Sequence, residues 1–113
     1  MCKIFVALVF SLFFCVSSLV YAGFSGPSIA PSKVRDVKKM RDDTNVVLVG
    51  KIEKSLGGEK YQFTDETGSI IVEIDEEKWM GVEVSPTDIV EIYGEVDKDW
   101  KRIKVDVDRI IKK

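Results

Sequence analysis

The sequence predicts a mainly β protein, a single small barrel of five strands, and three features indicate it. Five short segments after residue 44 are rich in β-branched residues or alternate apolar with polar positions. Gly50 and Gly94 fall inside the first and fourth segments, where closing so few strands requires a sharp coil that a Cβ would resist. A short helical stretch separates the third segment from the fourth. Together these features are typical of a five-stranded OB-fold barrel with a short N-terminal helix and a short helical turn between strands 3 and 4.

The first segment differs in composition from everything after it. Residues 4–20 follow Lys3, are apolar apart from three serines and contain no acidic residue. The segment ends in Val20-Tyr21-Ala22, where small residues occupy the positions that signal peptidase recognises. We therefore expect residues 1–22 to be a signal peptide that is cleaved after Ala22.

The chain then divides into a signal peptide, a lead-in and one domain. Residues 23–31 are rich in Gly, Pro and Ser, which predicts a flexible lead-in, and residues 32–113 form the barrel domain. Two other interpretations of the first segment stay open. It is close to the lower limit of about 17 residues for a membrane-spanning helix, which allows an uncleaved anchor. Lipid attachment at Cys15 is also possible, although a bulky residue, Phe14, precedes it.

Export predicts the compartment and the redox state of the domain. Both cysteines, Cys2 and Cys15, lie in the segment to be removed, so the exported chain must fold without a disulfide. The formal net charge of −2 becomes one unit more negative when Lys3 is lost, so nothing attracts polyphosphate strongly. We expect the protein in the periplasm, with no stable membrane insertion after signal cleavage.

A short amphipathic helix is expected ahead of the barrel. Ser32 follows a proline and is placed as the helix N-cap, and Val34, Val37 and Met40 recur at helical spacing. The helix is expected to close near residues 42–43.

The first three strands are expected to form a meander. The segments are residues 45–54, 60–64 and 69–74, with turns at residues 55–58 and 65–68 that contain glycine. In the third segment the same-face residues are apolar, which predicts that they point into the barrel: Ile70, Val72 and Ile74.

The second half of the barrel follows an acidic helical turn at residues 75–80. Residues 85–88 then lead into the fourth strand, and residues 97–100 make the last hairpin. The residues expected to face inward in the last two strands are Val90, Ile92, Gly94, Val96, Ile103, Val105 and Val107.

Several of these stretches occur together, in this order, in one known family. They are residues 40–44 running into NVVLVGKI, then FTDETGSIIVEID, then Trp79, and finally DIVEIYGEVDKDW with the closing strand. On these stretches the chain resembles the bacterial OB-fold (BOF) family of small periplasmic proteins. The resemblance implies an exported OB barrel that is associated with envelope stress tolerance and binds a ligand or partner without known catalysis.

The residue types that are missing argue against an enzyme. The chain has no His, and no Cys remains after residue 22, so the commonest general base, the thiol nucleophile and the usual zinc ligands are absent. We expect no catalytic residue, no cofactor and no dedicated metal site. Nucleic-acid binding is not expected either, because Tyr61 and Phe63 share a strand face that suits the core better than a stacking surface, and the net charge is negative.

A small envelope ligand, such as a cell-wall sugar, is the favoured partner, bound on the face of the first three strands. The candidate contacts are Lys51, Glu53, Glu73 and Trp100. Trp79 is expected to plug one end of the barrel, whereas Trp100 suits either a plug or a sugar-stacking surface.

Two alternatives stay open. An envelope protein could dock through an exposed edge of the barrel or through the N-terminal helix, in which case deletion of residues 23–43 should abolish the interaction. A divalent cation could bind the acidic turns, at residues 65–66, 75–77, 97 with 99, or 106 with 108. None of these has a recognised loop spacing, so a solvated surface is the simpler interpretation.

Overall fold

The computed structural model describes residues 29–113. The predicted signal peptide at residues 1–22, its predicted cleavage after Ala22, the two alternatives to it and most of the predicted lead-in lie outside the described residues. Within residues 29–113, no helix is long and apolar enough to cross a membrane.

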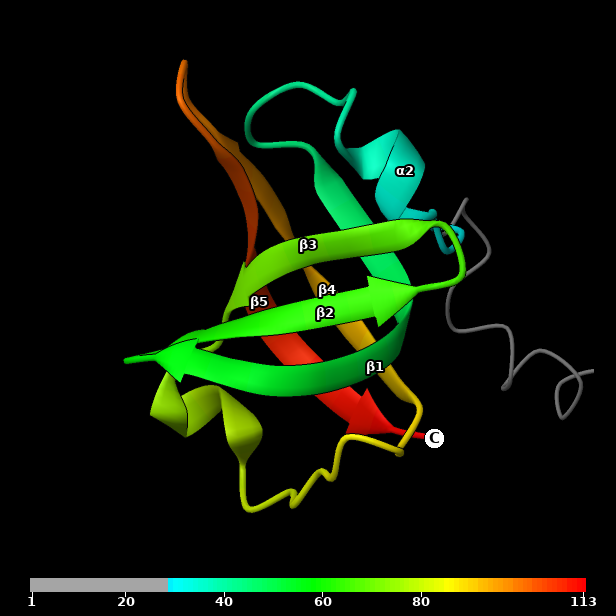
Figure 1. Ribbon diagram of the computed structural model, residues 1–113, viewed down its shortest axis with the longest axis vertical. Coiled ribbons are helices and arrows are strands. Elements are labelled where there is room, and N and C mark those ends of the chain that lie inside the picture. Colours follow the sequence, from blue (N-terminus) through cyan, green and yellow to red (C-terminus); the bar gives the residue numbers. More distant parts are fainter. Residues whose placement is uncertain (1–28) are drawn as a thin grey trace, which may run out of the picture.

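The described chain forms one closed barrel of five strands (Figure 1). Its elements are α2 (Val34–Val37), β1 (Asn45–Gly57), β2 (Lys60–Asp65), β3 (Gly68–Glu73), the 3-10 helix η1 (Glu76–Trp79), β4 (Val90–Lys98) and β5 (Ile103–Lys112). The strand order around the barrel is β1-β2-β3-β5-β4, and only β3 and β5 run parallel. The predicted OB-fold barrel, the short helix and the helical turn between the third and fourth strands are confirmed.

The barrel interior is apolar and contains no buried charged residue among residues 29–113. The alternation seen in the sequence places every predicted inward residue of β3 and β4 in the buried set. Phe63 is fully buried, and Tyr61 is half-buried against the core, so both have the core position expected of them. Trp79 also packs on the core, with its ring edge-on to Tyr61 at a centroid distance of 5.4 Å.

Two strand crossings explain the glycines of β1 and β4. At Gly50, where β1 changes its partner from β4 to β2, a Cβ would lie 2.4 Å from the carbonyl oxygen of Thr64. At Gly94 a Cβ would lie 2.2 Å from the carbonyl oxygen of Asp106 on β5. Both distances are far inside van der Waals contact, so glycine is what allows these strands to cross so closely.

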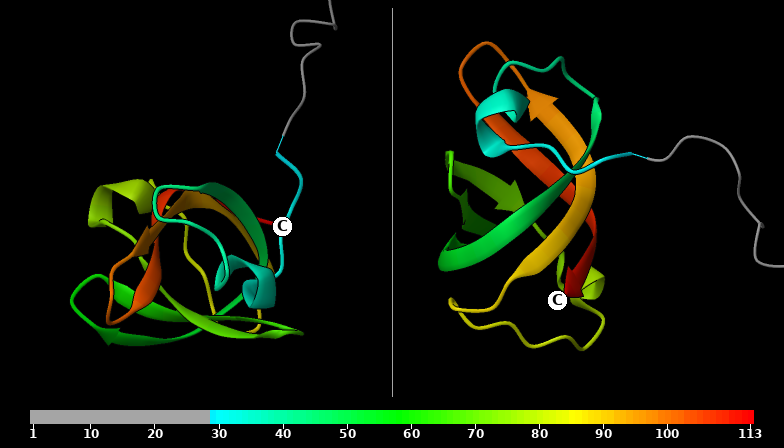
Figure 2. Two further views of the ribbon diagram at one scale, coloured as in Figure 1. Left: turned by 90° about the horizontal axis from the view of Figure 1, so that it is seen from above. Right: turned by 90° about the vertical axis from the view of Figure 1, so that its right-hand side faces the viewer.

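The N-terminal helix differs from the prediction. Ser32 is not its N-cap: its N–H donates to Val47 at 2.7 Å, and the residue bridges in parallel to β1. The first helical N–H groups are instead satisfied by the β2–β3 turn, because Val34 N–H donates to Asp65 at 2.9 Å and Arg35 N–H donates to Thr67 at 3.0 Å. The helix is a single turn, far shorter than predicted, and it packs beside β3 (Figure 2).

Two hairpins also extend further than predicted. β1 continues to Gly57, so its turn is formed by residues 58–59 and not by residues 55–58. β4 continues to Lys98, which places Trp100 in a tight turn beyond the barrel, 88% exposed. Trp100 therefore does not plug the barrel.

Candidate functional site

A hollow with both polar and apolar lining residues lies on the outer surface of β1 and β2. Its volume is about 400 Å³, and it is lined by Val49, Gly50, Lys51, Glu53, Thr64, Asp65, Glu66 and Ile89. Lys51 and Glu53 are two apart on one strand, so both side chains point outward while Ile52 points into the core. The close crossing at Gly50 lets β2 approach β1 here and forms the floor of the hollow.

A hydrogen-bond network fixes the carboxylate of Glu53. One of its oxygens accepts from Gln62 Nε2 and from Thr64 Oγ1, each at 2.9 Å. Thr64 also shares a hydrogen bond of 2.7 Å with Ser69 on β3. Because three neighbouring strands contribute, the orientation of Glu53 is set before any ligand arrives.

Asp65 and Glu66 at the rim of the hollow have structural partners. Burial acts to raise the pKa of Asp65, but hydrogen bonds from the Thr67 hydroxyl and from the Val34 and Thr67 N–H groups outweigh it and lower that pKa. Glu66 pairs with Lys33 at 2.6 Å, and this hydrogen bond lowers the pKa of Glu66. Both carboxylates are therefore committed to holding α2 on the β2–β3 turn.

The structure brings together two of the four predicted ligand residues. Lys51 and Glu53 share the hollow, but Glu73 lies at the far end of β3 and Trp100 lies at the β4–β5 turn. Lys51 is opposite Thr64, which is opposite Ser69, so Glu73 lies four residues further along β3, roughly 13 Å from Ser69 and further still from Lys51. A ligand role for each residue stays a prediction, but no one small molecule in the hollow contacts all four.

Glu73 belongs to a separate ionic group centred on Lys104 of β5. The ammonium of Lys104 donates to Glu73, lies 3.2 Å from Asp106 and lies 3.4 Å from Asp97. The hydrogen bond to Glu73 is the main cause of the raised pKa of Lys104, which stays charged at any physiological pH. This group joins the parallel strands β3 and β5.

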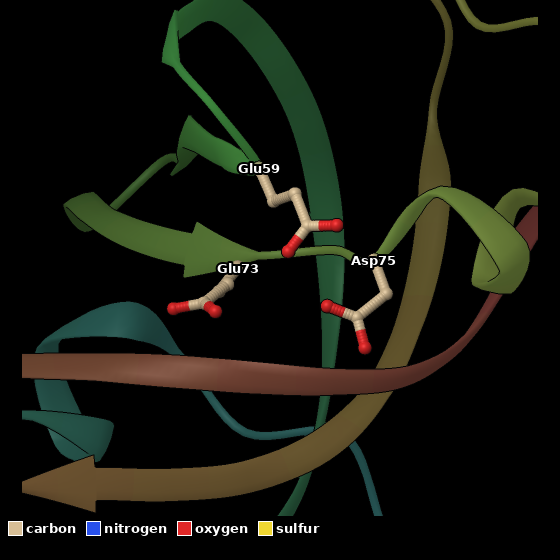
Figure 3. Close-up of side chains that lie close together, drawn as sticks. All are labelled: Glu59, Glu73 and Asp75. Atoms are coloured by element: carbon tan, nitrogen blue, oxygen red, sulfur yellow. The ribbon is translucent and has the colours of Figure 1, made fainter.

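A cluster of three carboxylates lies beside this group (Figure 3). Glu59 lies in the β1–β2 turn, Glu73 is the last residue of β3, and Asp75 immediately precedes η1. One oxygen of each carboxylate lies within 4.8 Å of the others. We call these three residues the carboxylate cluster.

The carboxylate cluster holds like charges together. The pKa of Glu59 is raised, chiefly by its interaction with the neighbouring carboxyl of Asp75, and partial desolvation adds to this. Within the described chain, neither Glu59 nor Asp75 forms an ion pair. Glu76 and Glu77 add to the negative charge nearby. The cluster therefore presents hard oxygen ligands without a protein cation for two of its three members.

Sequence reasoning singled out residues 75–77 but missed Glu59. The hairpin register could have located Glu59. The two-residue turn that pairs Asp65 with Gly68 also pairs Lys60 with Glu73. Glu59 must then lie next to the residues that follow Glu73. In the other acidic pairs weighed for a cation, at least one member has a protein partner: Asp99 accepts N–H groups of its own turn, and Asp97 and Asp106 face Lys104.

Comparison with known proteins finds relatives along almost the whole chain. A family profile described as bacterial OB fold (BOF) protein matches residues 16–112. Protein YgiW of Escherichia coli K12 is 40% identical over 97% of each chain. The calcium-regulated OB-fold protein CarO of Pseudomonas aeruginosa is 40% identical over 77% of each chain. The solved structure of YgiW from E. coli has a TM-score of 0.75 and 48% identity, and the match covers 81% of this chain and 99% of that one.

Proposed function

The chain belongs to the bacterial OB-fold (BOF) protein family, and on that premise we propose that it is a non-catalytic periplasmic protein that binds a small envelope molecule. The ligand occupies the hollow over Gly50, and the protein supports tolerance of envelope stress. The observation that carries this proposal is the hollow itself, where a cation, a fixed acceptor and apolar surface meet.

The lining of the hollow suits a polyhydroxylated ligand such as a cell-wall sugar. Lys51 donates, and Glu53 accepts through an oxygen position already fixed by Gln62 and Thr64. Ile89, which is 41% exposed, and Val49 offer apolar surface for the C–H face of a ring. A sugar hydroxyl both donates and accepts, so one ring satisfies Lys51 and Glu53 together.

Calorimetric titration of residues 23–113 with muropeptides and envelope sugars tests this proposal. This segment contains every residue of the apolar core. We expect saturable binding that Lys51→Ala and Glu53→Gln each weaken by about tenfold, because each loses a charge-assisted hydrogen bond. Lys54→Ala is the matched control, since Lys54 is exposed on the same strand but does not line the hollow. Flat titrations across the panel, or equal losses for Lys51→Ala and Lys54→Ala, would contradict the proposal.

A divalent cation at the carboxylate cluster is the second candidate. Calcium binds oxygen ligands at about 2.3–2.6 Å, so two oxygens on opposite sides of one ion are about 4.8 Å apart. The three carboxylate oxygens of Glu59, Glu73 and Asp75 lie within that same separation. One relative is named as calcium-regulated, so calcium is the first cation to test, although that name assigns no site.

A thermal melt with and without calcium chloride tests the second candidate. Binding to the folded state raises the melting temperature in proportion to occupancy. Glu59→Gln and Asp75→Asn should each abolish the rise, whereas Glu95→Gln, an exposed carboxylate on β4, should leave it intact. Identical melting curves with and without calcium would remove this candidate.

A further inference from the structure

The β4–β5 hairpin carries an exposed tryptophan beyond the barrel. Its turn, residues 99–102, projects from the barrel at the same end as the connection between α2 and β1 (Figure 1). Trp100 is 88% exposed and lines none of the main hollows of residues 29–113. A large apolar side chain held this far into solvent is not explained by the core.

The turn holds this tryptophan in a defined position. The Asp99 carboxylate accepts the N–H groups of Lys101 at 2.7 Å and Arg102 at 2.9 Å, and Asp99 N–H donates to the Arg102 carbonyl oxygen at 3.0 Å. The Lys101 ammonium lies 4.9 Å from the centre of the indole ring. The ring is therefore presented together with a cation that already covers one face, so a sugar would have to displace Lys101 to stack there.

The surface around Trp100 is basic. The connection from α2 is fastened to the hairpin, since Lys98 Nζ donates to the Met40 carbonyl oxygen at 3.2 Å and Asp43 N–H donates to Val96 at 2.7 Å. Six cations are thereby gathered at this end, and within the described chain none of them forms an ion pair: Lys38, Lys39, Arg41, Lys98, Lys101 and Arg102. The two segments that carry these cations, residues 38–43 and 98–102, contain three aspartates, and two of them accept backbone N–H groups: Asp42, Asp43 and Asp99.

Acidic residues of η1 lie away from the hairpin turn. η1, with Glu76 and Glu77 exposed, lies at the other end of the barrel (Figures 1 and 2). An anionic surface would therefore attract the hairpin turn more strongly than η1, which orients the molecule before contact.

We propose that the hairpin end, formed by Trp100, Lys101, Arg102 and the cations beside them, docks this protein on an anionic lipid bilayer. Tryptophan is favoured at the level of the lipid headgroups, where its ring is buried and its N–H stays hydrated. Each lysine or arginine near such a surface adds attraction to the lipid phosphates. The hollow over Gly50 is formed by other strands, so docking does not depend on the proposed ligand.

Vesicle binding by residues 23–113 tests this proposal, since the apolar residues 1–22 would themselves bind lipid. In the Trp79→Phe variant Trp100 is the remaining tryptophan of this segment. Its emission should shift to shorter wavelength with vesicles of phosphatidylcholine and phosphatidylglycerol, stay unchanged with phosphatidylcholine alone, and reverse at high salt.

Co-sedimentation with the same vesicles compares the variants. Lys101→Glu should weaken binding by about tenfold or more, and Trp100→Ala by several-fold. Lys54→Glu is the matched control, because it makes the same charge change on β1, away from the hairpin. Absence of binding to the anionic vesicles would overturn the proposal, and so would an equal loss for Lys101→Glu and Lys54→Glu. Binding to a free polyanion such as heparin without binding to vesicles would overturn it too.

Discussion

The hollow over Gly50 and the carboxylate cluster use the same residue types in opposite ways. In the hollow, hydrogen bonds from Thr67, Val34 and Lys33 lower the pKa of Asp65 and of Glu66. In the cluster, the neighbouring Asp75 raises the pKa of Glu59. Asp65 and Glu66 of the first region hold α2 on the barrel, whereas Glu59 and Asp75 of the second form no ion pair within the described chain and are available to a cation. The role of an acidic residue on this barrel therefore depends on which hydrogen-bond donors and cations surround its carboxylate.

The two strand crossings at Gly50 and Gly94 should respond alike to an added methyl group. Gly50→Ala and Gly94→Ala each place a Cβ within 2.4 Å of a carbonyl oxygen. We expect each to lower the free energy of unfolding by about 3 kcal/mol, since the strands must separate. Urea denaturation measures this. Gly58→Ala is the control, because its site is open and only the positive φ of 61° opposes it, at a cost of about 1 kcal/mol. Equal losses at Gly58 and Gly50 would show that crowding is not the cause.

Removing one carboxylate from each region should change the free energy of unfolding by different amounts. Asp65→Ala leaves the N–H groups of Val34 and Thr67 without their acceptor, so we expect a loss of about 2 kcal/mol in the free energy of unfolding. Asp75→Ala removes a like charge from the cluster, so in metal-free buffer we expect a change within about 0.5 kcal/mol. The comparison fails if Asp75→Ala destabilises as much as Asp65→Ala in the same denaturation experiment.

The pH dependence of stability should have opposite sign in the two regions, and this effect is the smallest. The lowered pKa of Asp65 stabilises the fold above its unfolded value of 3.8, and that stabilisation is lost as pH falls through the folded pKa. The raised pKa of Glu59 works in reverse: its ionisation weakens the fold as pH rises above 4.5. Relative to Asp65→Asn, the wild type should gain stability from pH 2 to 5. Relative to Glu59→Gln, it should lose stability from pH 4 to 7. If the two stability differences changed with pH in the same direction, the opposite pKa shifts of Asp65 and Glu59 would be contradicted.

Much of the barrel was predictable because side-chain alternation reports directly on which strand face is buried. Ile70, Val72 and Ile74 illustrate this, and Gly50 and Gly94 marked the crossings. The end of β1 was missed because residues 55–57 pair with β2 beyond the core and bury nothing. The helix cap was wrong because its acceptors, Asp65 and Thr67, come from about thirty residues away along the chain, which a local pattern does not reveal.

The candidate site was predictable only where residues are close in sequence. Lys51 and Glu53 share a strand face by period alone, so their meeting in the hollow follows from the pattern. Glu73 also occupies an outward-facing position on β3. It is displaced along that strand from Lys51 and Glu53, and only the strand register shows this displacement. Trp100 depends on where β4 ends, and Glu59 depends on the pairing of two hairpins.

A backbone amide NMR titration of residues 23–113 with a soluble muropeptide asks directly whether the hollow over Gly50 is the ligand site. If the hollow is the ligand site, the amides of residues 49–53, 64–66 and 89 should shift to saturation, while those of the carboxylate cluster and of residues 98–102 stay in place. Saturating shifts confined to the carboxylate cluster or to the hairpin turn, or no shifts at all, would show that the hollow is not the ligand site.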